Sequence, residues 1–127
     1  MAEISIINTI NAPTPKGAYS QGTVYKGMVY VAGQLPIDPK TDKVVEGGFK
    51  EQVKQAILNV KAVLEAGNSN LDSIVKLNAY LTDDSQFPLF NEVYSNMFDV
   101  KLPPRTTCVV SLGGYDIEID AIGVVCK

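Results

Sequence analysis

The sequence predicts an α+β fold, with one mixed β-sheet and two helices packed on one of its faces. Several short segments alternate apolar and polar residues as strands do, and two longer segments show the helical period. Their order along the chain is β-β-β-α-β-α-β-β. A length of 127 residues is typical of one domain, so we expect residues 1–127 to form a single domain.

The N-terminal half contains three predicted strands and the longer helix. Residues 4–7 form a short opening strand, followed by an irregular Gly/Pro-rich loop, "NAPTPKGAYSQG". The segment "TVYKGMVYVAGQL" predicts two strands joined in a hairpin at Lys26-Gly27, and "PIDPKTDK" predicts a turn. Over residues 48–66 apolar side chains recur at helical spacing, and Gly67 is the expected end of that helix.

The next two elements are a strand and a second helix. The segment "SIVKLNAYL" alternates, which predicts a strand whose apolar face carries Val75, Leu77, Ala79 and Leu81. A helix is predicted over residues 87–98, with Asp84 or Ser85 as its cap and Pro88 in its first turn.

Two final strands are predicted over residues 105–112 and 117–125, and we expect them to form a hairpin about "GGYD". Along the last strand, every second residue points away from the helices: Glu118, Asp120, Ile122, Val124 and Cys126. Apolar side chains in register on this second face predict that a partner subunit covers it. Oligomerisation is therefore expected, with the carboxylates near the rim of the interface.

Composition excludes several classes of function. The net charge is −3 and the basic residues are scattered, which argues against a nucleic acid as the main partner. The chain has no histidine, which excludes Ser-His-Asp and Cys-His catalysis and the usual zinc sites. The only cysteines, Cys108 and Cys126, form no C-x-x-C pair, so we expect two reduced, buried thiols and no metal. Neither a membrane-spanning run nor a signal peptide is present, so a cytoplasmic protein without membrane contact is expected.

Two residues are candidates for chemistry. Arg105 follows Pro103 and Pro104, which stiffen the chain before a guanidinium that can bind a carboxylate in a bidentate manner. The alternative is an ordinary surface ion pair. Glu118 lies on the outward face of the last strand, where burial would suit it to activate water. The alternative is an interfacial salt bridge, with Arg105 as a possible partner.

Three further positions suit a binding pocket. Tyr19 lies between glycines in "GAYSQG", where it either lines a pocket or packs the loop on the sheet. Gly33 ends a strand, where it allows backbone contact with a ligand or a bend. Asn91 is polar beside an apolar helix face, and capping or a surface site are the alternatives. No phosphate-loop, dinucleotide, zinc-protease or nucleophile-elbow motif occurs.

Taken together, the pieces "GAYSQG", "VYVAGQLPIDPKT", "QVKQAILNVKAVLEAG", "IVKLNAYLTD", "FPLFNEVYSNMF", "LPPRTTCVV" and "IEIDAIGV" resemble the Rid family, also called the YjgF or L-PSP family. The resemblance covers essentially the whole chain. It implies a chorismate mutase-like fold assembled as a homotrimer, with a site in each cleft between subunits. In the RidA-type branch it implies hydrolysis of reactive 2-imino acids, released by pyridoxal-phosphate enzymes, to 2-keto acids and ammonia without a cofactor.

The same resemblance implies a role for each candidate residue. Arg105 would clamp the substrate carboxylate and Glu118 would position or activate the water. The pocket would be completed by Tyr19 from the neighbouring subunit and by Gly33, Asn91 and Thr107.

This chain departs from the family pattern at two positions. Ala32 stands where many members have serine, and Thr107 stands where many bacterial members have cysteine. These two departures bear on which substrates are accepted and how fast they react. They bear less on the type of reaction. Two other functions stay open as well: a ribonuclease of the L-PSP type, and a non-catalytic module, regulatory or chaperone-like, that binds a 2-keto acid through Arg105.

Overall fold

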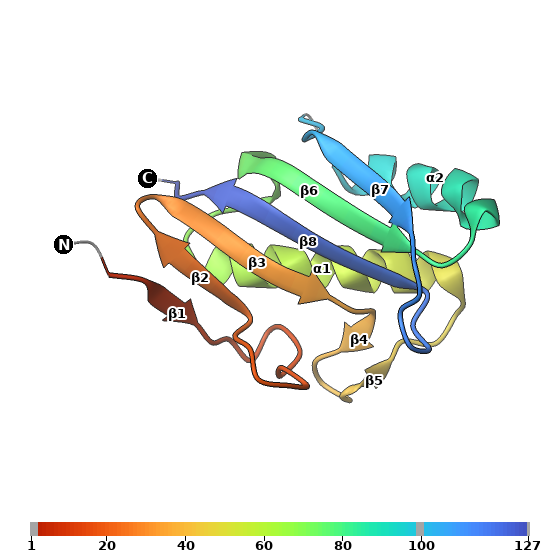
Figure 1. Ribbon diagram of the computed structural model, residues 1–127, viewed down its shortest axis with the longest axis horizontal. Coiled ribbons are helices and arrows are strands. Elements are labelled where there is room, and N and C mark those ends of the chain that lie inside the picture. The colour runs from red at the N-terminus through yellow and green to blue at the C-terminus, as the bar shows by residue number, and fades with distance from the viewer. Residues whose placement is uncertain (1–2, 99–100, 127) are drawn as a thin grey trace.

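Six strands form the main sheet of the computed structural model, which describes residues 3–98 and 101–126 (Figure 1). Across the sheet the strands lie in the order β1 (Ser5–Ile7), β2 (Gly22–Tyr25), β3 (Met28–Gln34), β8 (Ile117–Val124), β6 (Ile74–Leu81) and β7 (Arg105–Val109). All neighbours are antiparallel except β6 and β7, which are parallel. The sheet is therefore mixed, as predicted.

Two helices, α1 (Phe49–Ala66) and α2 (Phe87–Met97), lie on the same side of this sheet (Figure 1). Short 3-10 turns, η1 (Leu71–Ser73) and η2 (Asp84–Gln86), lead into β6 and α2. The apolar faces of α1 and α2 pack with the inner face of the sheet into one hydrophobic core. The predicted α+β class with two helices on one face is confirmed.

The predicted hairpin of the last two strands is wrong. Strand β6 lies between them, because β7 pairs in parallel with β6 and β8 pairs with the other side of β6. The connection from β6 to β7 runs through α2, and a helical crossover is what allows two successive strands to be parallel. Residue spacing alone did not reveal this crossover.

Several local predictions need correction for physical reasons. Ile74 rather than Val75 faces the core, because a bulge lies between Ile74 and Lys76. Asp83 rather than Asp84 or Ser85 forms the capping box, with Gln86, at the start of η2. The turn "PIDPKTDK" contains a two-stranded hairpin of β4 (Ile37–Asp38) and β5 (Lys43–Val44) that the sequence analysis missed.

The end of α1 is as predicted, but the reason for Gly67 is different. Its φ is −95°, and the left-handed residue after the helix is Asn68, with φ 66°. A Cβ on Gly67 would lie 2.9 Å from the side chain of Val29 in β3. Glycine is therefore required by the close approach of the helix end to the sheet.

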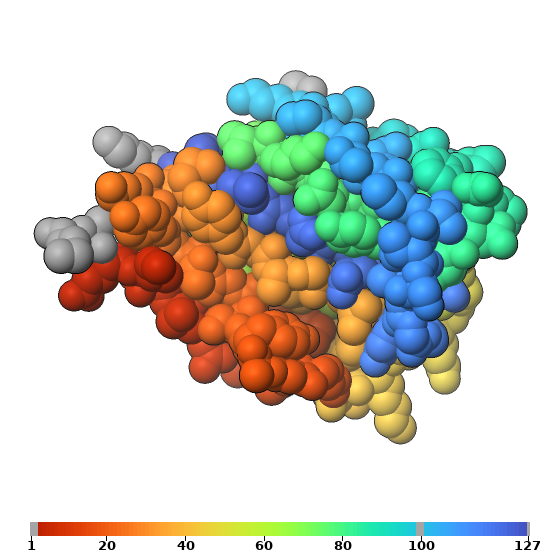
Figure 2. Space-filling model, viewed as in Figure 1, coloured from red at the N-terminus to blue at the C-terminus, as the bar shows by residue number. Residues whose placement is uncertain are grey.

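The second face of the sheet carries no helix and is turned toward the viewer in Figures 1 and 2. We call it the open face. The side chains on this face are apolar groups, tyrosines and carboxylates. They are those of Tyr30, Tyr80, Val110, Glu118, Asp120, Ile122 and Val124. Tyr30 and Val124 are 41% and 36% exposed, so the apolar character predicted for this face is confirmed in the single chain. No helix of the described residues has the length and hydropathy needed to span a membrane.

Candidate functional site

Arg105 begins β7 on the helix side of the sheet. Its backbone is held because the carbonyl of Pro104 accepts a hydrogen bond from the Leu77 N–H at 3.0 Å. Its Cζ lies 4.8 Å from the ring centroids of both Phe90 and Tyr94 on α2. The guanidinium thus rests on two aromatic rings, an arrangement that stabilises a cation without neutralising it.

The hydrogen-bonding capacity of Arg105 is largely unused. Nη2 donates to Oδ1 of Asn91 at 2.8 Å, and neither ion pair found among the described residues involves Arg105. The surface ion pair considered as an alternative is therefore not found within residues 3–98 and 101–126. A guanidinium has five N–H donors in a planar fork, so Arg105 retains capacity for a carboxylate.

A groove of about 310 Å³ lies beside this guanidinium. It is lined by Asn91, Tyr94, Ser95, Leu102, Pro103 and Arg105. Thr107, two residues further along β7, points to the same side of the sheet, and its Oγ1 is buried without a hydrogen-bond partner among the described atoms. We call Asn91, Arg105 and Thr107 the Arg105 group.

Glu118 lies on the open face, and Gly33 makes room for it. A Cβ on Gly33 would lie 2.7 Å from Cδ of Glu118, so any larger residue at this position would displace the carboxyl. The register of β3 against β8 shifts between Val31 and Gln34, and this bulge brings Gly33 over Glu118. The Glu118 side chain thus lies directly against the backbone of Gly33. Nothing in the sequence indicated this contact.

The protonation of Glu118 is shifted by its surroundings. Burial is the larger cause that raises the pKa of this carboxyl, and the negative charge of Asp120 is the second. Both effects disfavour the ionised form. Glu118 thus holds its proton at higher pH than an exposed glutamate, which suits a group that must take up and release a proton.

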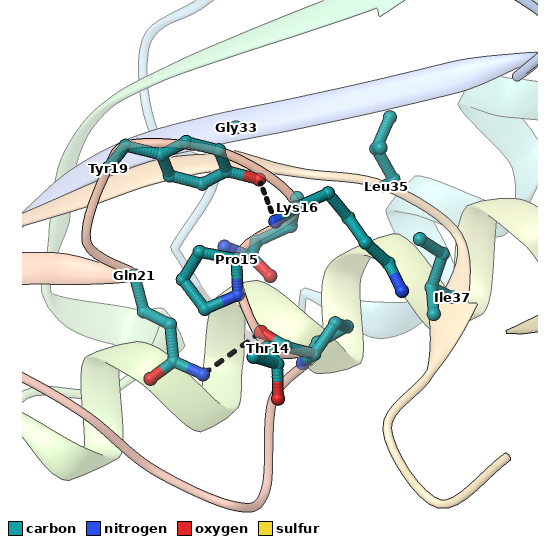
Figure 3. Close-up of a pocket in the computed structure, with 10 residues that line it drawn as sticks. Thr14, Pro15, Lys16, Tyr19, Gln21, Gly33, Leu35 and Ile37 are labelled. Atoms are coloured by element: carbon teal, nitrogen blue, oxygen red, sulfur yellow. Dashed lines mark hydrogen bonds between the residues drawn. The ribbon is translucent and has the colours of Figure 1, made fainter. Parts of the chain in front are cut away.

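Tyr19 lies in the loop before β2 and, with Gly33, lines a small pocket of about 20 Å³ (Figure 3). The side chain is 50% exposed, and its Oη accepts a hydrogen bond from the Lys16 N–H at 3.1 Å. The pocket has room for about one water molecule. We call Tyr19, Gly33 and Glu118 the Glu118 group.

Gln21 organises this loop and was missed by the sequence analysis, although it stands in the quoted motif "GAYSQG". It is buried, and its Nε2 donates to three loop carbonyls, those of Thr9, Ala12 and Pro13. Its Oε1 accepts from the Thr9 N–H at 2.7 Å. A glutamine between a glycine-rich loop and a strand was the available signal, because a buried amide must satisfy its hydrogen bonds locally.

The two groups do not meet within one chain. Arg105 pairs with Leu77, which pairs with Ala121, whereas Glu118 pairs with Tyr80. Two strand spacings and three residues therefore separate them, roughly 14 Å between backbone positions. Their side chains also point to opposite faces of the sheet. Within the part of the chain that the structure describes, Glu118 forms no salt bridge, and the interfacial salt bridge considered as its alternative stays a prediction about an assembly of subunits.

No group of three or more His, Cys, Asp or Glu side chains within residues 3–98 and 101–126 is arranged to hold a metal ion. Both thiols are free, but both are exposed, so the prediction that they are buried is wrong. The exposed state of Cys108 and Cys126 follows from their positions on an edge strand and near the end of the described chain.

Comparison with known proteins identifies the family. A family model described as endoribonuclease L-PSP matches residues 9–125. A RutC family protein of Pyrococcus horikoshii is 43% identical over 119 residues, which cover 92% of this chain and 94% of the relative. The 2-iminobutanoate/2-iminopropanoate deaminase of Rattus norvegicus is 37% identical over 121 residues, covering 94% of this chain and 88% of the relative.

Solved structures agree with this assignment. RidA from an Antarctic Psychrobacter species has a TM-score of 0.91 at 37% identity, covering 95% of this chain and 99% of that chain. Escherichia coli TdcF with bound serine has a TM-score of 0.90 at 33% identity, covering 96% and 99% of the two chains. The resemblance seen in the sequence is thus confirmed, and the chain belongs to the endoribonuclease L-PSP family, which includes the Rid and RutC proteins.

Proposed function

We propose that this protein hydrolyses reactive 2-imino acids to 2-keto acids and ammonia. The observation that carries the proposal is the guanidinium of Arg105, which lies beside a groove of about 310 Å³ with Asn91 as its hydrogen-bond partner. A small 2-imino acid offers the carboxylate that such a guanidinium binds. The 37% identical rat relative is named as a deaminase of such imines, which supports the choice of substrate.

The reaction needs orientation and proton transfer more than a strong nucleophile. The carbon of a protonated imine is electrophilic, so a water molecule held beside it can attack. Glu118 accepts a proton from this water as the C–O bond forms. It then returns the proton to nitrogen. As the C–N bond breaks, Glu118 takes the remaining hydroxyl proton and passes it to the departing ammonia, which leaves a 2-keto acid and an ionised Glu118. The raised pKa of Glu118 suits it to both transfers. Histidine, metal and organic cofactor have no part in this proposal.

We further propose that the site forms between subunits of a homotrimer. Arg105 and Glu118 lie on opposite faces of one chain, so a complete site needs the Arg105 group of one subunit and the Glu118 group of another. The exposed apolar side chains of the open face support a contact between copies. The number three rests on the family resemblance, and the cytoplasm as the location stays an expectation drawn from the sequence.

Other members support a small ligand with a carboxylate. The structure of Escherichia coli TdcF contains bound serine, an α-amino acid close in size to the proposed substrates. The name endoribonuclease also occurs in the family. The net charge of −3 and the few cations around either group make RNA hydrolysis the weaker candidate.

An imine-trapping assay tests the proposal. An amino-acid oxidase or threonine dehydratase generates the imine in the presence of semicarbazide, and formation of semicarbazone and keto acid is followed with and without this protein. We expect the wild type to compete with the trap and Arg105→Ala to lose the effect. The matched control is Lys61→Ala, which removes an exposed cation from α1, away from both groups.

If neither wild type nor variant alters the trapping rate while both stay folded, the deaminase proposal is wrong. Tight binding of a 2-keto acid that depends on Arg105 would then indicate the binding module. Salt-dependent RNA binding and cleavage would indicate the ribonuclease.

A further inference from the structure

Arg105 is the only arginine in the chain, and every other basic residue is a lysine. An arginine differs from a lysine because its flat cation can stack on an aromatic ring and still present a fork of N–H donors. Arg105 is used in this way. Two rings contact its guanidinium, and one hydrogen bond of its side chain is found among the described residues.

The three residues that contact the guanidinium lie within five successive positions of α2. Phe90 and Tyr94 are four residues apart, so their rings project from the same face of the helix. Asn91 follows Phe90, and its Oδ1 accepts the hydrogen bond from Nη2 of Arg105 at 2.8 Å. We call Phe90, Asn91 and Tyr94 the arginine support. The backbone of Arg105 belongs to β7, so one helix fixes the end of a side chain that starts on a different element.

The rings of the arginine support are part of the core. Phe90 is 0% and Tyr94 is 4% exposed, and their ring centroids lie 5.4 Å apart. Phe98 continues the stack, with its centroid 4.5 Å from that of Tyr94. Close-packed rings in a core have little freedom to move. A guanidinium that rests on them is ordered before a ligand arrives, and binding then loses less of its free energy to immobilising a long side chain.

Every member of the arginine support is uncharged. Phe90 has no ionisable group and Asn91 is an amide. Burial raises the pKa of Tyr94 to about 12, so its hydroxyl stays protonated near neutral pH. An aspartate at position 91 could accept the same hydrogen bond, but its negative charge would compete with a carboxylate ligand. The support thus holds Arg105 in place and leaves its positive charge available.

We infer that Phe90, Asn91 and Tyr94 are positioning residues that act on the substrate through Arg105. The rings set the plane of the guanidinium, and Asn91 occupies Nη2, so the remaining donors are left for a carboxylate in the adjoining groove. For Asn91 this is a different role from the pocket wall that the family resemblance implies. The effect on substrate binding rests on the proposed function, whereas the holding of Arg105 is measurable without a substrate.

The first test uses NMR of the free protein. Because the chain has a single arginine, its Nε–H gives one signal in a ¹H–¹⁵N spectrum. Ring currents move the signal of a proton held against an aromatic face upfield. We expect the wild-type signal to lie upfield of that of free arginine, and Phe90→Leu and Tyr94→Leu each to move it toward the free position.

The second test measures binding of 2-oxobutanoate, the keto acid that hydrolysis of 2-iminobutanoate yields, by titration calorimetry. Phe90→Leu and Tyr94→Leu should each raise Kd roughly three- to tenfold. In the trapping assay KM should rise by a similar factor at nearly unchanged kcat. Tyr94→Phe keeps the ring, so it should restore both Kd and the Nε–H signal. Asn91→Asp keeps the hydrogen bond but adds an anion, so Kd should rise by about tenfold or more while the ring-current shift persists.

The matched control is Phe98→Leu. It removes a ring from the same stack, and Phe98 makes none of the contacts between rings and the guanidinium found among the described residues. We expect this variant to lower the free energy of unfolding much as Phe90→Leu does. It should leave Kd and the Nε–H signal in place.

An Nε–H signal that neither ring variant moves would overturn the inference. Equal rises of Kd in Phe98→Leu and Phe90→Leu would also overturn it, because they would indicate a general loosening of α2. So would a loss in Tyr94→Phe equal to that in Tyr94→Leu, which would assign the effect to the hydroxyl. A wild type that neither binds 2-oxobutanoate nor hydrolyses imines, but whose signal still moves in the ring variants, would remove the proposed function and leave the holding of Arg105 in place.

Discussion

The Arg105 group and the Glu118 group are built in opposite ways. The guanidinium of Arg105 rests on the rings of Phe90 and Tyr94 and has a neutral hydrogen-bond partner, so its charge is available. Glu118 is half-buried beside another carboxylate, and both effects raise its pKa. The surroundings of Arg105 stabilise its positive charge, whereas the surroundings of Glu118 disfavour its negative charge. The first is suited to binding an anion and the second to moving a proton.

The separation of the two groups is also the reason for proposing a site between subunits. The sheet separates the two groups, which lie on its two faces and roughly 14 Å apart along the backbone. A homotrimer with sites between subunits would bring the binding group of one copy to the proton-transfer group of the next. Each prediction below tests one side of this comparison or the link between the sides.

The largest effect is expected when each group is disabled in turn and the two variants are then mixed. Arg105→Ala and Glu118→Gln should each reduce kcat/KM by about 100-fold or more, since one loses the carboxylate clamp and the other the proton carrier. After denaturation and refolding of an equal mixture, about one quarter of the sites would combine an intact Arg105 with an intact Glu118 from a neighbour. Activity of the mixture, measured by the trapping assay, should rise to that fraction of wild type.

The control for this experiment is the same mixture without refolding, together with each variant refolded alone. Activity that stays at the level of the single variants after mixing would show that both residues act within one chain.

The acid limb of the pH–rate profile should report Glu118. Because its pKa is raised above the ordinary value of 4.5, the ionised form that accepts a proton from water is lost on acidification at higher pH than for an exposed glutamate. We expect kcat/KM to fall as pH decreases through that raised pKa, and Glu118→Gln to show no such limb. A wild-type limb at or below 4.5 would contradict the assignment.

Gly33→Ala should damage the Glu118 group through sterics alone. Its added Cβ would lie 2.7 Å from Glu118 Cδ, so the carboxyl must move. We expect kcat/KM to fall roughly tenfold and the free energy of unfolding to fall by at most about 1 kcal/mol, because the end of the Glu118 side chain can move. Denaturant unfolding of a double-mutant cycle with Glu118→Ala supplies the control, because the same glycine substitution should be nearly neutral once the carboxyl is gone. If Gly33→Ala lowers the free energy of unfolding equally with Glu118 and with Ala at position 118, the glycine is needed for the local backbone and not for the carboxyl.

The smallest effect is expected at Thr107. Its Oγ1 is buried and has no hydrogen-bond partner among the described residues, so Thr107→Val should stabilise the fold by up to about 1 kcal/mol. If Oγ1 contacts substrate, KM should rise about three- to tenfold at unchanged kcat. Thr106→Val is the matched control, since its Oγ1 accepts from Lys76 Nζ on the open face. Identical KM values for the wild type and Thr107→Val would exclude that contact.

Much of the fold was predictable from local pattern. Helical spacing located α1 and α2 to within one residue at their ends, and Lys26-Gly27 marked the hairpin of β2 and β3. The hairpin assigned to the last two strands was wrong, because strand pairing depends on which edges meet in space. The small hairpin of β4 and β5 was missed because each strand has two residues, too few for an alternation to appear.

The sequence by itself determined the family, the two-helix α+β class, the apolar open face and the residue types available for chemistry. These follow from periodicity, from the absence of histidine and from motifs spread along the whole chain. Only the tertiary structure decided that Arg105 and Glu118 lie apart. Strand β6 separates their strands, and their side chains point to opposite faces of the sheet. It also decided the neighbours of each charge. Phe90 and Tyr94 reach Arg105 through the packing of α2, and Asp120 with its hydrogen-bond donors, Asn78 and Tyr80, lies beside Glu118 through the register of β6 and β8. Contacts between strands distant in sequence set these environments, and alternation along one strand contains no information about them.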